Sequence, residues 1–202
     1  MKTTLALIAA AVSLSAGEAS AATTFFSDLG PGGSYNCCAG WAVGGPVSPA
    51  APAESFTSLS SGEVANIDIA IGQVFSGTVN VSLWTDSGGA LGTELGSWTV
   101  TPATFFGLST TILTDVHVSG VSLVSGDSYF LELASAGTSS WNWNTIGATG
   151  TLIDSGATTP GDTLGAFEVV GAPEPATWAL MLAGFAGMGA ALRSRRARPA
   201  AA

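Results

Sequence analysis

His117 is the only histidine of the chain, so Ser-His-Asp or histidine-based zinc chemistry would have to use it. It alternates with Val116 and Val118 in a strand-like run, which predicts an imidazole that faces solvent. No G-x-S-x-G elbow accompanies it to hold a serine nucleophile. One histidine and one cysteine pair also cannot supply the usual tetrahedral ligands of zinc. The sequence therefore predicts no catalytic residue, no metal and no cofactor.

Paired carboxylates could hydrolyse glycosides, because that reaction needs two acids about 5 to 10 Å apart. Glu132 is predicted on the outward face of its strand, and Asp68 lies on another polar strand face where it could be a neighbour. Acids on solvated faces are the common case, so a glycoside hydrolase is a remote alternative. Asp86 and Glu94 flank glycines without EF-hand spacing, and a hairpin turn explains those glycines without calcium.

A run of alternating tryptophans and asparagines suggests sugar binding, and it consists of Trp141, Asn142, Trp143 and Asn144. In a strand, the two indoles share one face and the two amides share the other. Flat aromatic rings pack on the apolar faces of pyranoses, while amides hydrogen-bond to hydroxyls. The alternative is that both indoles fill the core between two sheets. The sequence leaves both interpretations open.

Cys37 and Cys38 are adjacent and are the only cysteines of the chain. Thiols in an oxidising compartment tend to pair, so a disulfide is expected. A bond between adjacent residues closes a strained eight-membered ring, but the two thiols are at high effective concentration. A bond between molecules needs only an exposed loop, which the surrounding glycines predict. The ring is favoured and the intermolecular cross-link is the alternative.

The elements that carry these residues show a two-residue period typical of half-buried strands. Their predicted inward residues are Ala65, Ile67, Ile69 and Ile71; Val79, Val81 and Leu83; Ile112, Thr114, Val116 and Val118; and Tyr129, Leu131 and Leu133. Turn-forming clusters separate the runs at 61–63, 75–78, 85–92 and 124–127. This pattern predicts an all-β fold, an antiparallel β-sandwich of jelly-roll type. Residues 30–53 are predicted as an irregular loop with a short strand at 41–43.

The charge distribution excludes several functions for the middle of the chain. All five basic residues lie before residue 22 or after residue 172, whereas twelve of the fourteen acids lie between these positions. Nucleic-acid binding depends on basic groups that neutralise phosphates, so no nucleic-acid partner is expected. Nucleotide and anionic-lipid binding are unexpected for the same reason.

Both ends predict export. Lys2, an apolar stretch and the small residues at 19–21 predict a secretory signal peptide over residues 1–21. Residues 176–192 carry no charge and would form a helix of about 25 Å, which is close to the minimum for a single transmembrane helix. The basic end at 193–202 favours a cytoplasmic C-terminus, and its arginines are Arg193, Arg195, Arg196 and Arg198. Residues 22–172 are therefore predicted as one extracellular domain.

The tail over residues 173–202 resembles the PEP-CTERM sorting signal of Gram-negative bacteria. The resemblance is carried by Pro173, Glu174 and Pro175, followed by the short apolar span and the arginine cluster. It implies recognition and processing by an exosortase at the inner membrane, with the C-terminal helix in the membrane before processing. It also implies delivery to the cell surface or to the exopolysaccharide matrix.

Part of the middle of the chain is similar to the choice-of-anchor R domain. The resemblance rests on "GWAVGG" at 40–45, "AESFT" at 53–57 and "VSLWTDSGGALGTEL" at 81–95, and it covers roughly residues 35–135. It implies a bacterial β-sandwich joined to surface-anchoring tails, with no enzymatic activity attached.

These observations together predict an exported, non-enzymatic cell-surface or extracellular-matrix protein. The alternative is a carbohydrate-binding module that retains exopolysaccharide through the tryptophans at 141 and 143.

Overall fold

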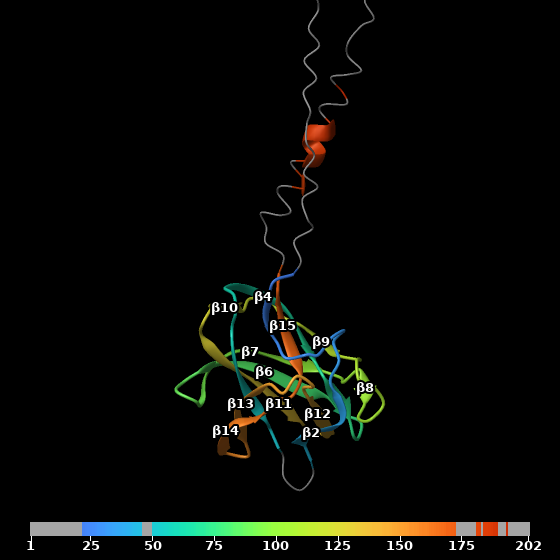
Figure 1. Ribbon diagram of the computed structural model, residues 1–202, viewed down its shortest axis with the longest axis vertical. Helices are drawn as coiled ribbons and strands as arrows, with labels where there is room; N and C mark the ends of the chain where they lie inside the picture. Colours follow the sequence, from blue (N-terminus) through green and yellow to red (C-terminus); the bar gives the residue numbers. More distant parts are fainter. Residues whose placement is uncertain (1–21, 46–49, 173–180, 183, 190–192, 194–202) are drawn as a thin grey trace, which may run out of the picture. The chain divides into compact units, whose positions relative to one another are not determined.

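Alternating apolar side chains form the inward faces of the strands, as the two-residue period predicts. The computed structural model describes residues 22–45, 50–172, 181–182, 184–189 and 193. One compact unit spans Ala22–Ala172, and it is all-β with antiparallel sheets consistent with the predicted sandwich. Figure 1 labels its strands along the chain.

Three sheets make up this unit. Sheet I has the order β1 (Thr24–Ser27), β15 (Phe167–Gly171), β4 (Gly62–Ile69) and β10 (Ser122–Leu123), and β9 (Thr114–His117) also pairs with β4. Sheet II has the order β14 (Ala157–Thr163), β13 (Thr149–Asp154), β3 (Ala53–Thr57), β11 (Ser128–Ser135), β6 (Val79–Asp86) and β7 (Leu91–Val100). Sheet III has the order β2 (Asn36–Gly44), β12 (Thr138–Trp143), β5 (Ile71–Gln73) and β8 (Thr104–Phe105).

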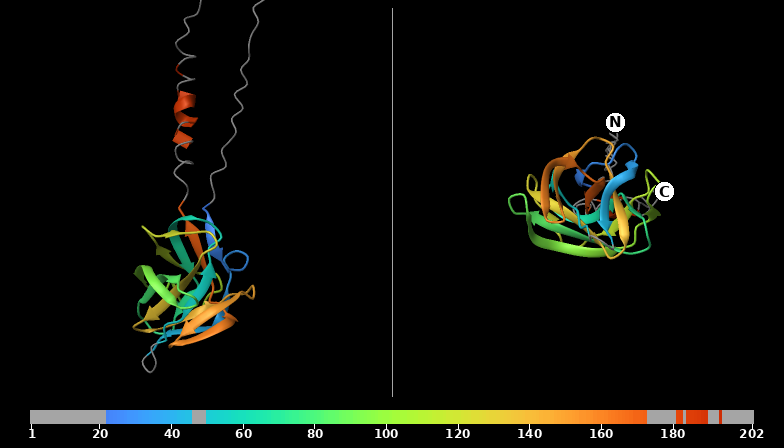
Figure 2. Two further views of the ribbon diagram at one scale, coloured as in Figure 1. Left: turned by 90° about the vertical axis from the view of Figure 1, so that its left-hand side faces the viewer. Right: turned by 90° about the horizontal axis from the view of Figure 1, so that it is seen from below.

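A large hydrophobic cluster lies among these strands, which surround it in the view from below (Figure 2), and a smaller cluster contains Tyr35, Ala70 and Ala166. Many fully buried side chains of the large cluster come from the predicted inward positions, among them Ile67, Ile69, Val81, Leu83, Leu131 and Leu133. Each such side chain contributes about 1.5 to 3 kcal/mol when it leaves water. Phe167 of β15 packs against both Phe56 and Trp141, with ring centroids 5.5 and 5.6 Å apart. These contacts join strands of all three sheets.

The glycine-rich segment between β6 and β7 forms the predicted hairpin turn. Gly88 and Gly89 have φ angles of +70° and +87°, which glycine adopts without steric cost. The carboxylate of Asp86 accepts a hydrogen bond from the backbone N–H of Gly89 at 2.6 Å. This contact closes the turn and accounts for the aspartate without a metal ion.

Three parts of the fold differ from the prediction. The segment predicted as a loop contains the nine-residue strand β2, which pairs with β12. Its period is masked by glycines and by a bulge between Asn36 and Gly40. Ile112 is exposed because β9 begins only at Thr114. Finally, β5 and β8 pair in parallel, unlike the other paired strands that the structure describes.

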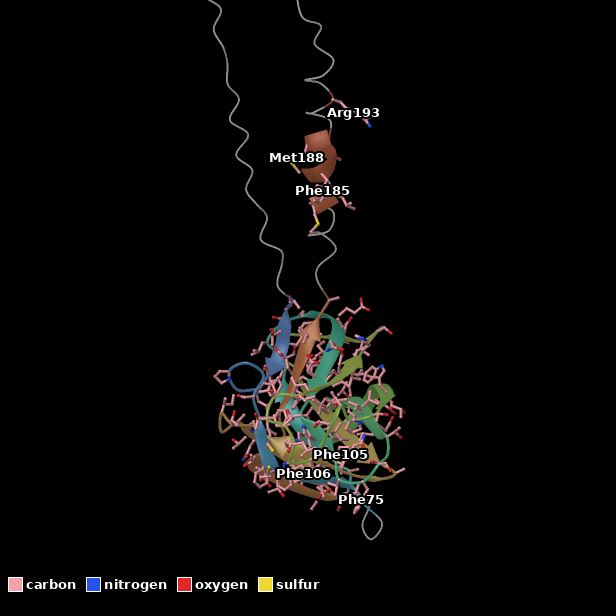
Figure 3. The ribbon with its side chains drawn as sticks, turned by 90° about the vertical axis from the view of Figure 1, so that its right-hand side faces the viewer. Phe75, Phe105, Phe106, Phe185, Met188 and Arg193 are labelled. Atoms are coloured by element: carbon pink, nitrogen blue, oxygen red, sulfur yellow. The ribbon has the colours of Figure 1, made fainter. Side chains whose placement is uncertain are left out.

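The predicted signal peptide lies outside the described residues, as does most of the predicted membrane span. Residues 181–182 and 184–189 are helical, with Phe185 and Met188 exposed, and Arg193 is also in helical conformation (Figure 3). Among the residues that the structure describes, no helix has the length and apolar character needed to cross a membrane.

Candidate functional site

The outward surface of sheet II carries a set of polar side chains next to one tryptophan. On β6 the apolar residues point into the core, so the alternate residues point outward. The strand register places Thr99 opposite Asn80, and both Ser97 and Glu132 opposite Ser82. We call this surface the β6–β7 polar face, and it comprises Asn80, Trp84, Ser97, Thr99 and Glu132 together with Ser82, which is buried among them.

Side chains of the β6–β7 polar face hydrogen-bond to one another. The amide nitrogen of Asn80 donates to Ser97 Oγ at 2.9 Å, and the Asn80 amide oxygen lies 3.1 Å from the same hydroxyl. Ser82 Oγ and Ser97 Oγ are 3.0 Å apart. Thr99 Oγ1 lies 3.4 Å from the Asn80 amide oxygen. These bonds hold the hydroxyls in fixed positions across two strands, which prepares them to meet another polar surface.

Trp84 and Glu132 form one end of this face. The indole Nε1–H donates to Glu132 Oε2 at 3.0 Å, which fixes the ring orientation while leaving part of the ring exposed. Burial raises the pKa of the Glu132 carboxyl, the Trp84 hydrogen bond opposes that rise, and the negative charge of Glu94 adds to it. The half-exposed indole therefore lies beside two acids.

A shallow hollow of about 250 Å³ adjoins the other end of the face. Its lining residues are Thr78, Asn80, Thr99, Ala134, Ser135 and Ala136. The hollow thus continues the row of hydroxyl and amide groups onto a patch of small side chains. Together, hollow, polar row and indole offer hydrogen-bonding groups and one flat aromatic ring on a single surface.

The predicted sugar platform lies elsewhere, and most of it is buried. Trp141 is fully buried, packs against Phe167, and donates its Nε1–H to the carbonyl of Ala166 at 3.2 Å. Asn142 and Asn144 are also buried. Of the two interpretations of Trp141, Asn142, Trp143 and Asn144, burial favours the core for all but Trp143, which is half-buried.

Asn142 of β12 and Asn144, which directly follows β12, bond to backbone groups of neighbouring segments. The Asn142 amide donates to the carbonyl of Ala70 at 2.9 Å. The Asn144 amide donates to the carbonyls of Ala148 and Leu164 at 2.9 and 2.8 Å, and its oxygen accepts from the N–H of Ala148 at 2.8 Å. Their side-chain amides therefore supply hydrogen-bond partners for backbone groups of Ala70, Ala148 and Leu164, which is a structural role.

Trp143 is half-buried and packs edge-on against Trp41, with ring centroids 5.6 Å apart. The Nε1–H of Trp41 donates to the carbonyl of Thr163 at 2.8 Å. The Nε1 atom of Trp143 is buried without a hydrogen-bond partner among the described residues. Of the two predicted sugar-stacking rings, only Trp143 retains an exposed part, and Trp41 covers one side of it.

Two buried carboxyls belong to residues that no sequence pattern singled out, Glu54 of β3 and Asp28 after β1. Glu54 accepts from the N–H of Gly165 with both oxygens, at 2.8 and 2.7 Å, and Asp28 accepts from the N–H of Phe167 at 2.7 Å. The second oxygen of Asp28 is buried and has no hydrogen-bond partner in the described part of the chain. A single buried acid does not alter the hydrophobic period of its strand, so its burial is seen only in the folded structure.

Burial favours the neutral form of both carboxyls. Burial raises the pKa of Asp28 to about 7, although hydrogen bonding to the Phe167 backbone opposes this rise. Burial also raises the pKa of Glu54 well above its usual range; the Gly165 N–H opposes that rise, whereas Asp28 and Asp162 add to it. No Lys or Arg is present between residues 22 and 172 to compensate the two groups. Because no Lys or Arg is available to form an ion pair, the two buried carboxyls avoid an unpaired charge by binding a proton.

The other residues with potential for chemistry are separated. His117 is almost fully exposed and lies 3.8 Å from the carboxylate of Asp115, which confirms the prediction that it faces solvent. Asp68 lies on β4 of sheet I and Glu132 on β11 of sheet II, so the predicted proximity of these two acids is wrong. The nearest acids to Asp68 are Asp115 and Glu168, which belong to sheet I.

Cys37 and Cys38 lie on β2 at the edge of sheet III, with Cys37 half-buried and Cys38 exposed. Both thiols are free, and their sulfur atoms are 2.7 Å apart. Of the sorting residues, Arg193 is described and exposed. The remainder lie outside the described residues; they are Pro173, Glu174, Pro175, Arg195, Arg196 and Arg198.

Comparison with known families gives one match. Residues 172–196 match the PEP-CTERM protein-sorting motif. This motif implies export across the inner membrane and processing by an exosortase, and it confirms the prediction made from the tail. No curated protein matches the chain.

Proposed function

We propose that residues 22–172 act as a non-enzymatic protein of the cell surface or extracellular matrix in a Gram-negative bacterium. The proposed route begins with a signal peptide at 1–21 and ends with removal of the sorting tail. On this route the C-terminal helix holds the chain in the inner membrane only until the exosortase acts.

The observation that carries this proposal is the position of the sorting motif relative to the last strand. β15 ends at Gly171, and the motif match begins at residue 172. Processing beyond residue 172 would therefore leave each strand of the unit Ala22–Ala172 in place. A sorting signal that lies after the last strand can be removed without disrupting the folded domain.

Two further features support a surface role. The domain carries twelve acids and no Lys or Arg, which favours solubility and repulsion from anionic polymers. The similarity to the choice-of-anchor R domain over about residues 35–135, and with it a jelly-roll connectivity, forms part of the same proposal. Neither feature supplies a reactive group.

The test replaces Pro173, Glu174 and Pro175 by alanine in the full chain, expressed in a host that has its exosortase. We expect an unprocessed form of higher mass in the inner-membrane fraction. A matched control replaces the exposed Thr158 and Thr159 of β14 by alanine and should be sorted normally. Sorting of the tail variant to the surface at the normal mass would refute the proposal.

A second candidate function is binding of neutral glycans by the β6–β7 polar face. The exposed part of the Trp84 ring can stack on a sugar, and the hydroxyls and amide beside it can bond to sugar hydroxyls. The acids Glu94 and Glu132 beside the ring disfavour anionic glycans. This candidate replaces the residues predicted from the sequence with a different tryptophan.

Native gel electrophoresis with and without hydroxyethyl cellulose tests the second candidate. Retardation of the unaltered protein that is lost in Trp84→Ala and in Asn80→Ala, but kept in Thr158→Ala, supports it. Alginate, an anionic polymer, should give no retardation. Equal mobility of the unaltered protein with and without the neutral polymer would reject glycan binding and leave the sorting proposal intact.

A further inference from the structure

Strand β2 departs from regular geometry at its two cysteines. β2 pairs with β12 so that Asn36 lies opposite Trp143 and Gly40 lies opposite Asn142. The three residues between Asn36 and Gly40 therefore have no partners in this register and bulge from the edge of sheet III. Edge bulges re-aim side chains, and this one contains both thiols.

The bulge places the sulfur atoms on the same side of the chain. Adjacent residues of a regular strand point to opposite faces, which would keep the two thiols apart. Here Cys38 has a φ of +83°, a left-handed conformation that costs a non-glycine residue about 1 to 2 kcal/mol. As a result the two Sγ atoms are only 2.7 Å apart. The strained backbone conformation of Cys38 thus accompanies the contact between the two thiols.

The surroundings of the pair hold the bulge and leave it accessible. The N–H of Cys37 donates to the carbonyl of Tyr35 at 3.1 Å, and the N–H of Tyr35 donates to the carbonyl of Thr110 at 2.9 Å. Cys38 is exposed, and its sulfur lies next to Gly107 in the turn that follows β8. Phe105 and Phe106 of that region lie toward the lower end of the domain in Figure 3. A small oxidant or an enzyme can therefore reach the Cys38 sulfur.

We propose that Cys37 and Cys38 are a vicinal dithiol that is oxidised to a ring disulfide after export, and that the ring is a reversible two-electron redox site. The oxidant is a disulfide, either of an exported thiol oxidoreductase or of a small thiol. One cysteine thiolate attacks the donor disulfide, forms a mixed disulfide and releases one donor thiolate. The second cysteine thiolate then attacks the bonded cysteine sulfur and releases the other donor thiolate.

The atoms and electrons of this exchange balance. The two cysteine thiols lose two electrons and two protons, and the donor disulfide takes up both to become two thiols. Hydrogen bonding with Cys37 raises the pKa of the Cys38 thiol, so the exchange should accelerate as the pH rises. The prior contact between the sulfurs favours ring closure over a bond to a second molecule.

Acid quenching followed by maleimide labelling and intact-mass measurement tests the ring on the exported full chain. We expect a monomer with no label before reduction and two labels after reduction. Titration of the purified protein against glutathione buffers should interconvert the two forms. Two labels without reduction, or a dimer that reductant dissociates, would overturn the proposal.

A matched control keeps two thiols but separates them. The double variant Cys37→Ala, Ala42→Cys moves one thiol to an exposed position on the same strand. We expect this variant to take two labels without reduction or to form mixed disulfides and dimers. An unlabelled monomer from this variant would show that protection in the unaltered chain does not arise from the adjacent ring, and would also overturn the proposal.

Discussion

At the scale of single residues, Asp28 makes the stability of the domain depend on pH. Its pKa is about 7 in the folded chain, whereas the ordinary value of 3.8 applies to the unfolded chain. Between these values the folded state binds more protons, so the free energy of unfolding falls as the pH rises. Each group that behaves in this way lowers the free energy of unfolding by up to about 1.4 kcal/mol per pH unit between its two pKa values. Burial also raises the pKa of Glu54, so this group acts in the same direction.

We therefore predict that the domain is most stable near pH 4 and loses stability up to pH 7. Asp28→Asn keeps an acceptor for the Phe167 N–H but removes the titration, so the loss between these pH values should be smaller. Urea unfolding at pH 4.5 and 7.5 measures the difference. Asp127→Asn on an exposed turn serves as the control and should keep the full pH dependence. Equal pH dependence in Asp28→Asn and the unaltered protein would contradict the role assigned to Asp28.

The exposure of a side chain could be predicted from the sequence where it depends on a short local pattern. His117 alternates with valines and faces solvent, so local periodicity was sufficient. Burial of Asp28 and Glu54 depends instead on Gly165 and Phe167, which lie more than a hundred positions away in the chain. The same limit applies to Trp141. Its pattern fitted both a surface platform and a core strand, and only contact with Phe167 decided between them.

At the scale of elements, strands with clean alternation were predictable and irregular ones were not. The predicted inward residues of β6 and β11 are buried, and so are Ile67 and Ile69 of β4, while the β6–β7 turn follows its glycines. The period fails at Val64, which is buried in place of Ala65, and at Phe130, which is buried on the other face of β11. β2 was missed because a bulge and several glycines interrupt its period. β14 contains Pro160, which an edge strand tolerates because one side of its backbone needs no partner. The parallel contact of β5 and β8 links segments thirty residues apart and has no local signature.

The contact between β12 and the segment before β15 predicts a specific effect of one methyl group. A Cβ added at Gly165 would lie 2.6 Å from three ring atoms of Trp141, which is fully buried and cannot move outward. Gly165→Ala should therefore destabilise the domain by about 3 kcal/mol, as overpacking does. Gly147→Ala provides the comparison, because its φ of +75° is unfavourable for alanine but the space around it is open. Its cost should be about 1 kcal/mol.

Denaturant unfolding of both glycine variants, at the pH of maximum stability, measures the two free energies of unfolding. Equal losses would mean that Trp141 can adjust its position and that the core around β12 is loosely packed. A greater loss for Gly165→Ala would assign Trp141 a structural role. That result would also explain why the alternating tryptophans and asparagines are not available to a ligand.

At the scale of the whole molecule, the boundary between the folded unit and the sorting motif predicts how far the chain can be shortened. β15 lies between β1 and β4 in sheet I, so each of its sides pairs with another strand. Its Phe167 and Val169 are fully buried in the core. The N–H of Ala172 also donates to the carbonyl of Glu63 at 3.0 Å. A chain that ends at residue 172 therefore keeps every one of these contacts.

We predict that residues 22–172 fold with the same thermal unfolding midpoint as the exported, processed protein, and that residues 22–166 do not fold. Loss of two buried side chains and of the pairing on both sides of β15 removes several kcal/mol, which is comparable to the total stability of a typical domain. Far-UV circular dichroism and thermal unfolding compare the two fragments. A cooperative transition in the 22–166 fragment would show that β15 is dispensable. In that case the position of the sorting motif directly after β15 would no longer mark the end of the fold.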